Sequence, residues 1–181
     1  KDLKNEALAT YLTYIERKPD NFAAAEFLLE VIALYPENST KAFAYKVKFV
    51  EDYFVGTNAW NKFTDQQQQQ ILGHLSQFSL LKARQLYATA QDTDYDLEED
   101  ESAAYRIAAV WFEKYLNSQQ MLAELNLTTD EQQTFIQQLM LAAQARYIAS
   151  DYVASIEHYQ KLVELQPGSA DSLYSLIIVY Q

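Results

Sequence analysis

Residues 151–180 read DYVASIEHYQKLVELQPGSADSLYSLIIVY, and this stretch decides the fold class. Apolar residues recur every three or four positions as far as Leu165, which is the spacing of one face of an α-helix. Pro167 then ends the helix, because proline has no backbone N–H and restricts the residue before it. A new apolar run follows from residue 170. The stretch therefore predicts two helices joined by a tight turn.

Other boundaries along the chain are of the same kind. Pro19 and Pro36 each follow a helical stretch and precede turn-forming residues. Thr64 and Thr128 each stand three residues before a Gln or Glu, which is the pattern of a capping box. The sequence thus predicts eight helices and no strand, over residues 3–18, 23–35, 39–55, 64–91, 102–117, 128–149, 152–166 and 170–181.

The composition supports an all-α fold and excludes several classes of protein. The 181 residues include only three Gly and three Pro, too few for the turns of an all-β chain or the loops of a nucleotide-binding fold. With 49% hydrophobic residues a core can form, and without Cys there is no disulfide scaffold or thiol nucleophile. The net charge of -11 disfavours nucleic-acid binding. No apolar run is long enough to span a bilayer.

The segment before Pro167 resembles the second helix of a tetratricopeptide (TPR) repeat. Ser155 stands where that repeat has Ala, and Tyr159 stands four residues later where it has an aromatic residue. The same spacing of a small and an aromatic residue recurs twice, as Ala7 with Tyr11 and Ala108 with Phe112. The small residue lets paired helices approach closely, and the aromatic ring fills the gap beside it. The resemblance implies a right-handed α–α superhelix of TPR-like hairpins with about eight helices.

The resemblance also implies how the chain is organised. Residues 1–181 would form a single helical-repeat array, and residues 57–101 would be an atypical insertion with a long helix and an acidic loop. Residues 1–18 match a second helix without its first, and residues 170–181 match a first helix without its second. We therefore expect the array to be a fragment of a longer chain.

Residues 41–116 are similar to a group of bacterial cell-envelope TPR proteins. That similarity implies a periplasmic or outer-membrane-associated location. It also implies a scaffold that binds a partner peptide or subunit in an envelope complex.

The repeat resemblance implies a groove lined by the first helix of each hairpin. Helical spacing gives the candidate partner-binding residues as Glu26, Glu30, Gln137, Met140, Gln144, Tyr147 and Tyr174. This acidic, amide and aromatic set lacks the basic clamp that some TPR proteins use for a carboxylate, so we expect a neutral or basic partner. Met140 and Tyr147 have an alternative role in the core between repeats.

A purely structural spacer or assembly scaffold without a peptide groove remains the alternative function. The last predicted helix, residues 170–181, has little polar face, so self-association through this apolar helix is a further possibility.

No catalytic constellation stands out. His74 and His158 belong to no metal-binding pair, and the chain has no Gly-x-Ser-x-Gly elbow or Gly-rich phosphate loop. We therefore predict no catalytic residues. An enzyme would require one of these two histidines to converge with carboxylates in a pocket.

Residues 92–101 are the most acidic segment, with seven carboxylates in ten positions and therefore a candidate cation site. The candidate calcium ligands are Asp92, Asp94, Asp96 and Glu98. The segment is not an EF-hand, because Leu97 replaces the turn glycine and Ala103 replaces the bidentate Glu. A solvated loop without a cofactor and a looser site for calcium, which would modulate the scaffold, both remain open.

Overall fold

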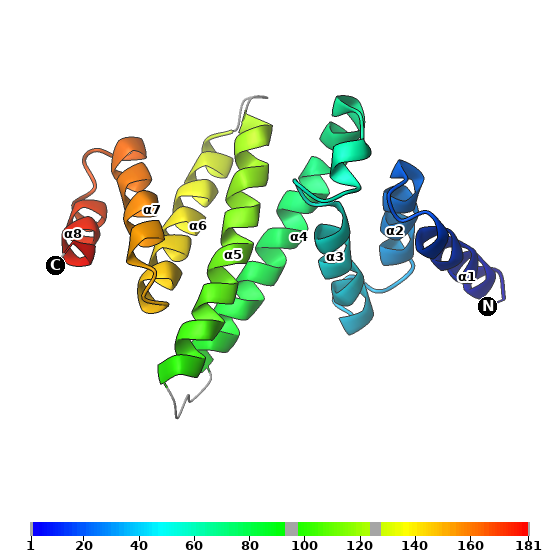
Figure 1. The fold of residues 1–181 in the computed structure, drawn as a ribbon, viewed down its shortest axis with the longest axis horizontal. Coiled ribbons are helices and arrows are strands. Elements are labelled where there is room, and N and C mark those ends of the chain that lie inside the picture. The colour runs from blue at the N-terminus through cyan, green and yellow to red at the C-terminus, as the bar shows by residue number, and fades with distance from the viewer. Residues whose placement is uncertain (1, 93–97, 124–127, 181) are drawn as a thin grey trace. The chain divides into compact units, whose positions relative to one another are not determined.

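The computed structural model describes residues 2–92, 98–123 and 128–180, which form eight α-helices, one short 3-10 helix and no strand (Figure 1). In chain order the elements are α1 (Asp2–Arg17), α2 (Phe22–Ala33), α3 (Thr40–Tyr53), η1 (Trp60–Lys62), α4 (Asp65–Asp92), α5 (Glu98–Ala123), α6 (Thr129–Ile148), α7 (Tyr152–Leu165) and α8 (Ala170–Val179). The prediction of an all-α chain is confirmed for the described residues.

Both predicted capping boxes are present. The backbone N–H of Thr64 donates to Oε1 of Gln67 at 3.0 Å, and the N–H of Gln67 donates back to Thr64 Oγ1 at 3.3 Å. At the start of α6 the N–H of Thr128 donates to Glu131 Oε2 at 2.7 Å, and the return bond measures 3.4 Å. These reciprocal bonds satisfy N–H groups that have no partner within the helix, and so they fix where α4 and α6 begin.

Helix α5 is longer at both ends than the predicted residues 102–117. It begins at Glu98, so the predicted acidic loop over residues 92–101 is wrong at its edges, and Asp92 is the last residue of α4. Four acidic residues occupy positions 98–101, and acidic residues suit the first turn of a helix because its N-terminal end is positive. The sequence instead predicts a loop over these four residues, with the helix beginning at residue 102.

The chain divides into two compact units, Lys1–Phe78 and Ser79–Gln181, with the boundary inside α4. Aromatic rings and aliphatic side chains together form the core of the first unit. The ring of Phe49, which is fully buried, lies 5.7 Å from that of Phe78, and the ring of Tyr53 lies 6.0 Å from that of Phe63. Trp60 of η1 is also buried.

In the second unit, α5, α6, α7 and α8 pack one against the next along the chain (Figure 1). Small residues dominate where the end of α4 meets α5 and α6. The buried cluster there consists of Ala90, Tyr105, Ala109, Ala145 and Ala149. Alanines allow the helices to approach closely, and Tyr87 packs its ring against that of Tyr105 at 5.3 Å.

The α6–α7 hairpin has the buried small and aromatic residues that the sequence predicted. Ser155 is fully buried and donates from Oγ to the carbonyl of Ala143 at 2.9 Å. Tyr159, one turn further along α7, is 4% exposed. A small side chain at 155 thus lets α7 lie directly on the backbone of α6.

Three residues make the turn between these two helices. Ser150 has a φ of 58°, in the left-handed region that favours glycine. Its N–H donates to the carbonyl of Tyr147, and the N–H of Asp151 donates to that of Arg146, both at 2.9 Å. This pair of bonds is the Schellman motif, which ends α6 and reverses the chain.

Candidate partner-binding surfaces

Four of the predicted partner-binding residues lie on one face of α6. Gln137, Met140, Gln144 and Tyr147 are spaced by three or four positions, so their side chains follow one stripe along the helix. Gln137 is exposed, Tyr147 is 39% exposed, and the two residues between them are half-buried. A partner could therefore reach both ends of the stripe more easily than its middle.

The middle of the stripe is partly covered by α4. Tyr87 Oη lies 3.4 Å from Oε1 of Gln144, longer than an ordinary O–H···O hydrogen bond, so this contact holds the amide weakly. One turn away, Arg84 Nε lies 3.5 Å from Oε1 of Gln138, which is buried. Sequence analysis missed both contacts, because their partners lie more than fifty positions apart and share no motif.

An aromatic pair marks the end of α6. The rings of Tyr147 and Tyr152 lie 5.7 Å apart at an interplanar angle of 60°, across the turn to α7. Both side chains are exposed, and so are those of the neighbouring Ile148 and Val153. Exposed tyrosines combine apolar area with a hydroxyl group, and are therefore common in protein interfaces.

Helix α8 presents a second exposed apolar surface. Leu173, Ile177 and Tyr180 are exposed and lie on one face, and Tyr174 is 67% exposed. The hydroxyl of Tyr180 accepts a hydrogen bond from Gln160 Nε2 of α7 at 2.8 Å, which attaches the end of α8 to the hairpin. The apolar character predicted for this helix is thus displayed at the surface.

Glu26 and Glu30 lie on α2 in the first unit. Both side chains are exposed, and their spacing of four places them on the same face of the helix. The other five predicted partner-binding residues belong to the second unit. The structure thus divides the predicted set between two units.

A cluster of ionisable side chains ties α5, α6 and α7 together. Arg146 donates from Nε to Glu113 Oε1 at 2.7 Å and from Nη2 to Oε2 at 2.6 Å. Its Nη1 donates to Asp151 Oδ2 at 2.9 Å, and His158 Nε2 lies 3.0 Å from Glu113 Oε1. One carboxylate therefore contacts side chains from two further helices.

The cluster favours the ionised form of Glu113. Burial would raise the pKa of Glu113, but hydrogen bonds from His158 and Arg146 outweigh it and hold that pKa below its ordinary value. The hydrogen bond to Glu113 is also the main reason that the pKa of Arg146 is raised. The structure places His158 of α7 against Glu113 of α5.

His74 has a different environment. It lies on α4 with its ring 5.7 Å from that of Phe78 and 6.4 Å from that of Phe49. Burial lowers the pKa of His74, which favours its neutral form. His74 belongs to the first unit and His158 to the second.

The predicted calcium ligands are only partly within the described residues. Asp92 ends α4 and Glu98 begins α5, whereas Asp94 and Asp96 lie outside the described residues. Within the three described ranges, no group of three or more His, Asp or Glu side chains is arranged to hold a metal ion.

No helix in the described part of the chain is long and apolar enough to cross a membrane. Comparison of the sequence with protein-family models gives no match, and comparison with curated protein sequences gives none either. The functional proposals therefore rest on the residues and their arrangement.

Proposed function

We propose that the chain is a protein–protein interaction module: a TPR-like superhelix of helix hairpins that binds a partner peptide or subunit in a bacterial envelope complex. The observation that carries this proposal is the stripe on α6, where Gln137 and Tyr147 are accessible on a well-packed hairpin. Rigid helices hold such side chains in fixed positions, which lowers the entropic cost of binding.

Packing within the hairpin supports the TPR-like part of the proposal. The repeat needs a small residue and then an aromatic one at the helix contact, and Ser155 and Tyr159 are both buried there. Ala108 and Phe112 of α5, which have the same spacing, are also completely buried.

The chemistry of the surface favours a neutral or basic partner segment. Amide side chains can donate and accept hydrogen bonds with a peptide backbone, while Tyr147 and Tyr152 offer aromatic faces. The second unit has six basic and fifteen acidic residues, so its field attracts positive charge. Arg and Lys side chains on the partner could also stack on the exposed tyrosines.

We propose binding without catalysis. His158 is the one histidine that contacts a carboxylate in the described structure, and that carboxylate, Glu113, is already bonded twice to Arg146. The lowered pKa of Glu113 makes this carboxylate a weak base, whereas a general base works best with a pKa near the working pH.

Selection of peptides from a random display library on the immobilised full chain tests the proposal. Peptides with basic and apolar residues should be enriched. Tyr147→Ala should lower the affinity for these peptides about tenfold, as expected for an aromatic anchor in an interface. Gln137→Ala should lower this affinity less than Tyr147→Ala does. Leu165→Ala, which truncates a 48% exposed apolar side chain at the far end of α7, is the control and should leave binding unchanged.

Failure to enrich any peptide, or equal losses in Leu165→Ala and Tyr147→Ala, would count against a binding stripe on α6. Enrichment of acidic peptides that depend on Tyr147 would leave the stripe in place and contradict the expected charge of the partner.

A second candidate function is a structural assembly scaffold, which the exposed face of α8 favours. Leu173, Ile177 and Tyr180 would pair with the same residues of a second copy. Sedimentation velocity should then show association that rises with concentration and that Ile177→Lys abolishes. A native chain that remains monomeric at high concentration would remove this candidate.

Modulation by calcium is a separate proposal for residues 92–98. Millimolar calcium should raise the melting temperature more than millimolar magnesium does, and Asp94→Asn should reduce the difference. Equal melting curves with both ions would dispose of it.

A further inference from the structure

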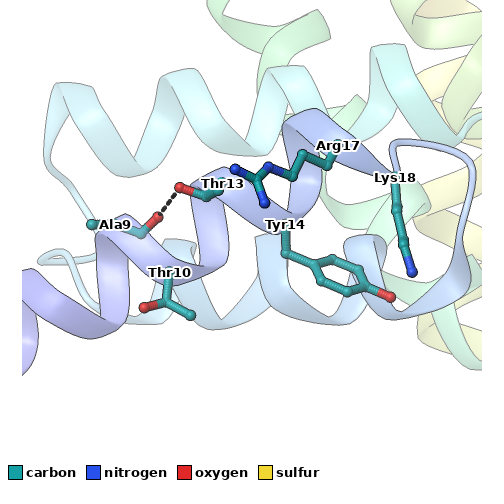
Figure 2. A pocket seen from close by; sticks show the side chains of 6 residues that line it. All are labelled: Ala9, Thr10, Thr13, Tyr14, Arg17 and Lys18. Carbon is teal, nitrogen blue, oxygen red and sulfur yellow. Dashed lines mark hydrogen bonds between the residues drawn. The ribbon is translucent and has the colours of Figure 1, made fainter.

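An open hollow of about 500 Å³ lies along the outer face of α1 (Figure 2). Two rows of side chains with a spacing of four residues line it: Ala9, Thr13 and Arg17 in one, and Thr10, Tyr14 and Lys18 in the other. Parallel rows with a groove between them are the feature into which the side chains of another helix pack.

The middle of the hollow is lined by two small side chains, Thr10 and Thr13, and both of their hydroxyl groups are hydrogen-bonded within α1. Thr10 Oγ1 donates to the carbonyl of Glu6 and Thr13 Oγ1 to that of Ala9, both at 2.8 Å. Because the helix itself satisfies these hydroxyls, the surface offered to a ligand is mainly methyl groups. Small side chains there would let the backbone of a second segment approach closely.

Positive charge is concentrated at one end of the hollow. Arg17 and Lys18 are both exposed there, next to Tyr14, whose ring centroid lies 5.7 Å from Lys18 Nζ (Figure 2). Within the described residues neither cation takes part in an ion pair, and none of the six lining residues is acidic. The hollow therefore combines an apolar middle with two available cations.

The charge of the first unit is compatible with an acidic ligand. This unit has eight basic and ten acidic residues, whereas the second has six and fifteen, so the first unit repels negative charge much less. Two cations are too few for the multiple phosphate contacts that hold nucleic acids, which favours a protein segment as the ligand.

We propose that the hollow on α1 binds an acidic helical segment of a partner protein. Small side chains of that segment pack over Thr10 and Thr13, and its carboxylates contact Arg17 and Lys18. The site is distinct from the α6 stripe, takes a ligand of opposite charge, and does not depend on the function proposed for that stripe.

Fluorescence anisotropy with a labelled peptide of about 15 Ala and Glu residues, long enough to form a helix, tests the proposal on the full chain. A peptide with Gln in place of every Glu is the matched probe. The Glu peptide should bind about tenfold more tightly, and added salt should reduce the difference because exposed charges are screened.

Two variants separate the parts of the site. Arg17→Gln combined with Lys18→Gln removes the cations and should weaken the Glu peptide about tenfold. Thr13→Trp keeps both cations but fills the hollow, and should weaken binding to a similar degree. Lys41→Gln combined with Lys48→Gln removes two other exposed lysines of the same unit, and should leave binding unchanged.

Several results would overturn the proposal. Equal affinity for the Gln peptide would show that the carboxylates contribute nothing to binding. An equal loss in the Lys41 and Lys48 control would show that binding depends only on the overall charge of the unit. Native affinity in Thr13→Trp would show that the hollow is not occupied. If an oligonucleotide of equal charge bound more tightly than the peptide, the ligand of the hollow would be a nucleic acid and not a protein segment. If Thr13→Trp disturbs α1 by circular dichroism, the cation variants and the Gln peptide decide the question.

Discussion

Arg146 contacts both carboxylate oxygens of Glu113, with Nε at 2.7 Å from Oε1 and Nη2 at 2.6 Å from Oε2. A planar guanidinium matches a carboxylate in this arrangement, so the pair fixes orientation as well as distance between α6 and α5. Arg146 is only 13% exposed at its side chain, which reduces screening by solvent.

Replacing Arg146 by Met should lower the free energy of unfolding by about 2–3 kcal/mol, because Glu113 then loses two charge-assisted hydrogen bonds while partly buried. Urea denaturation followed by circular dichroism measures the change. Lys48→Met is the matched control, since Lys48 forms an exposed pair with Asp52 at 2.8 Å. The control should lose less than about 1 kcal/mol, and equal losses in the two variants would contradict the assigned strength of the Arg146 pair.

The pair of Glu113 and Arg146 also predicts that the stability of the fold depends on pH. Burial raises the pKa of Glu113, but the hydrogen bonds from His158 and Arg146 outweigh it, so Glu113 is more acidic in the folded chain than in the unfolded one. Its contribution to stability is therefore complete above its ordinary pKa of 4.5 and is lost as the pH falls through the lower folded value.

Between about pH 5 and pH 3, the unfolding free energy of Glu113→Gln should therefore fall less steeply than that of the native chain. Glu131, whose pKa is lowered mainly by the backbone hydrogen bond at Thr128, titrates in the same direction. Glu131→Gln shows how much of the slope belongs to that cap. A Glu113→Gln profile parallel to the native one would refute the assignment.

Ser150→Gly should stabilise the chain by about 1 kcal/mol, because the backbone at this position is left-handed and glycine adopts that conformation without steric strain. Ser150→Val should be destabilising by a similar amount or more, since a β-branched side chain fits this conformation poorly. Thermal melting of both variants measures the effects. A lower melting temperature for the glycine variant than for the native chain would argue against the turn geometry.

Ser155→Leu should destabilise the chain by about 2–3 kcal/mol, because a large side chain would force α7 away from α6. Ser155→Ala should lose about 1 kcal/mol with its hydrogen bond to the carbonyl of Ala143. Glu157→Leu, at an exposed position of the same helix, should change stability by less than about 0.5 kcal/mol. If Ser155→Leu changed stability as little as Glu157→Leu, the inference of a close contact between α6 and α7 would be wrong.

The fold was predictable where local chemistry decides helix ends. Pro36 and Pro167 stop helices by removing a backbone donor, and the capping boxes at Thr64 and Thr128 start them. The start of α5 was missed, because acidic residues suit both a solvated loop and a first helical turn. Hydrophobicity alone does not separate these two cases.

The candidate surfaces were predictable only in part. Helical spacing placed Gln137 and Tyr147 on one face of α6, and both are exposed. It could not reveal that Tyr87 reaches Gln144, or that Glu113 contacts both Arg146 and His158. Those partners come from different helices, and their pairing depends on how the helices pack.

The two tryptophans of the chain fall one in each compact unit, Trp60 in the first and Trp111 in the second, and both are buried. The sequence thus carries an intrinsic optical reporter for each half. In Trp60→Phe only the indole of α5 emits, and in Trp111→Phe only that of η1. The emission spectra of these two variants along a denaturant series would show directly whether the halves melt in one step or in two.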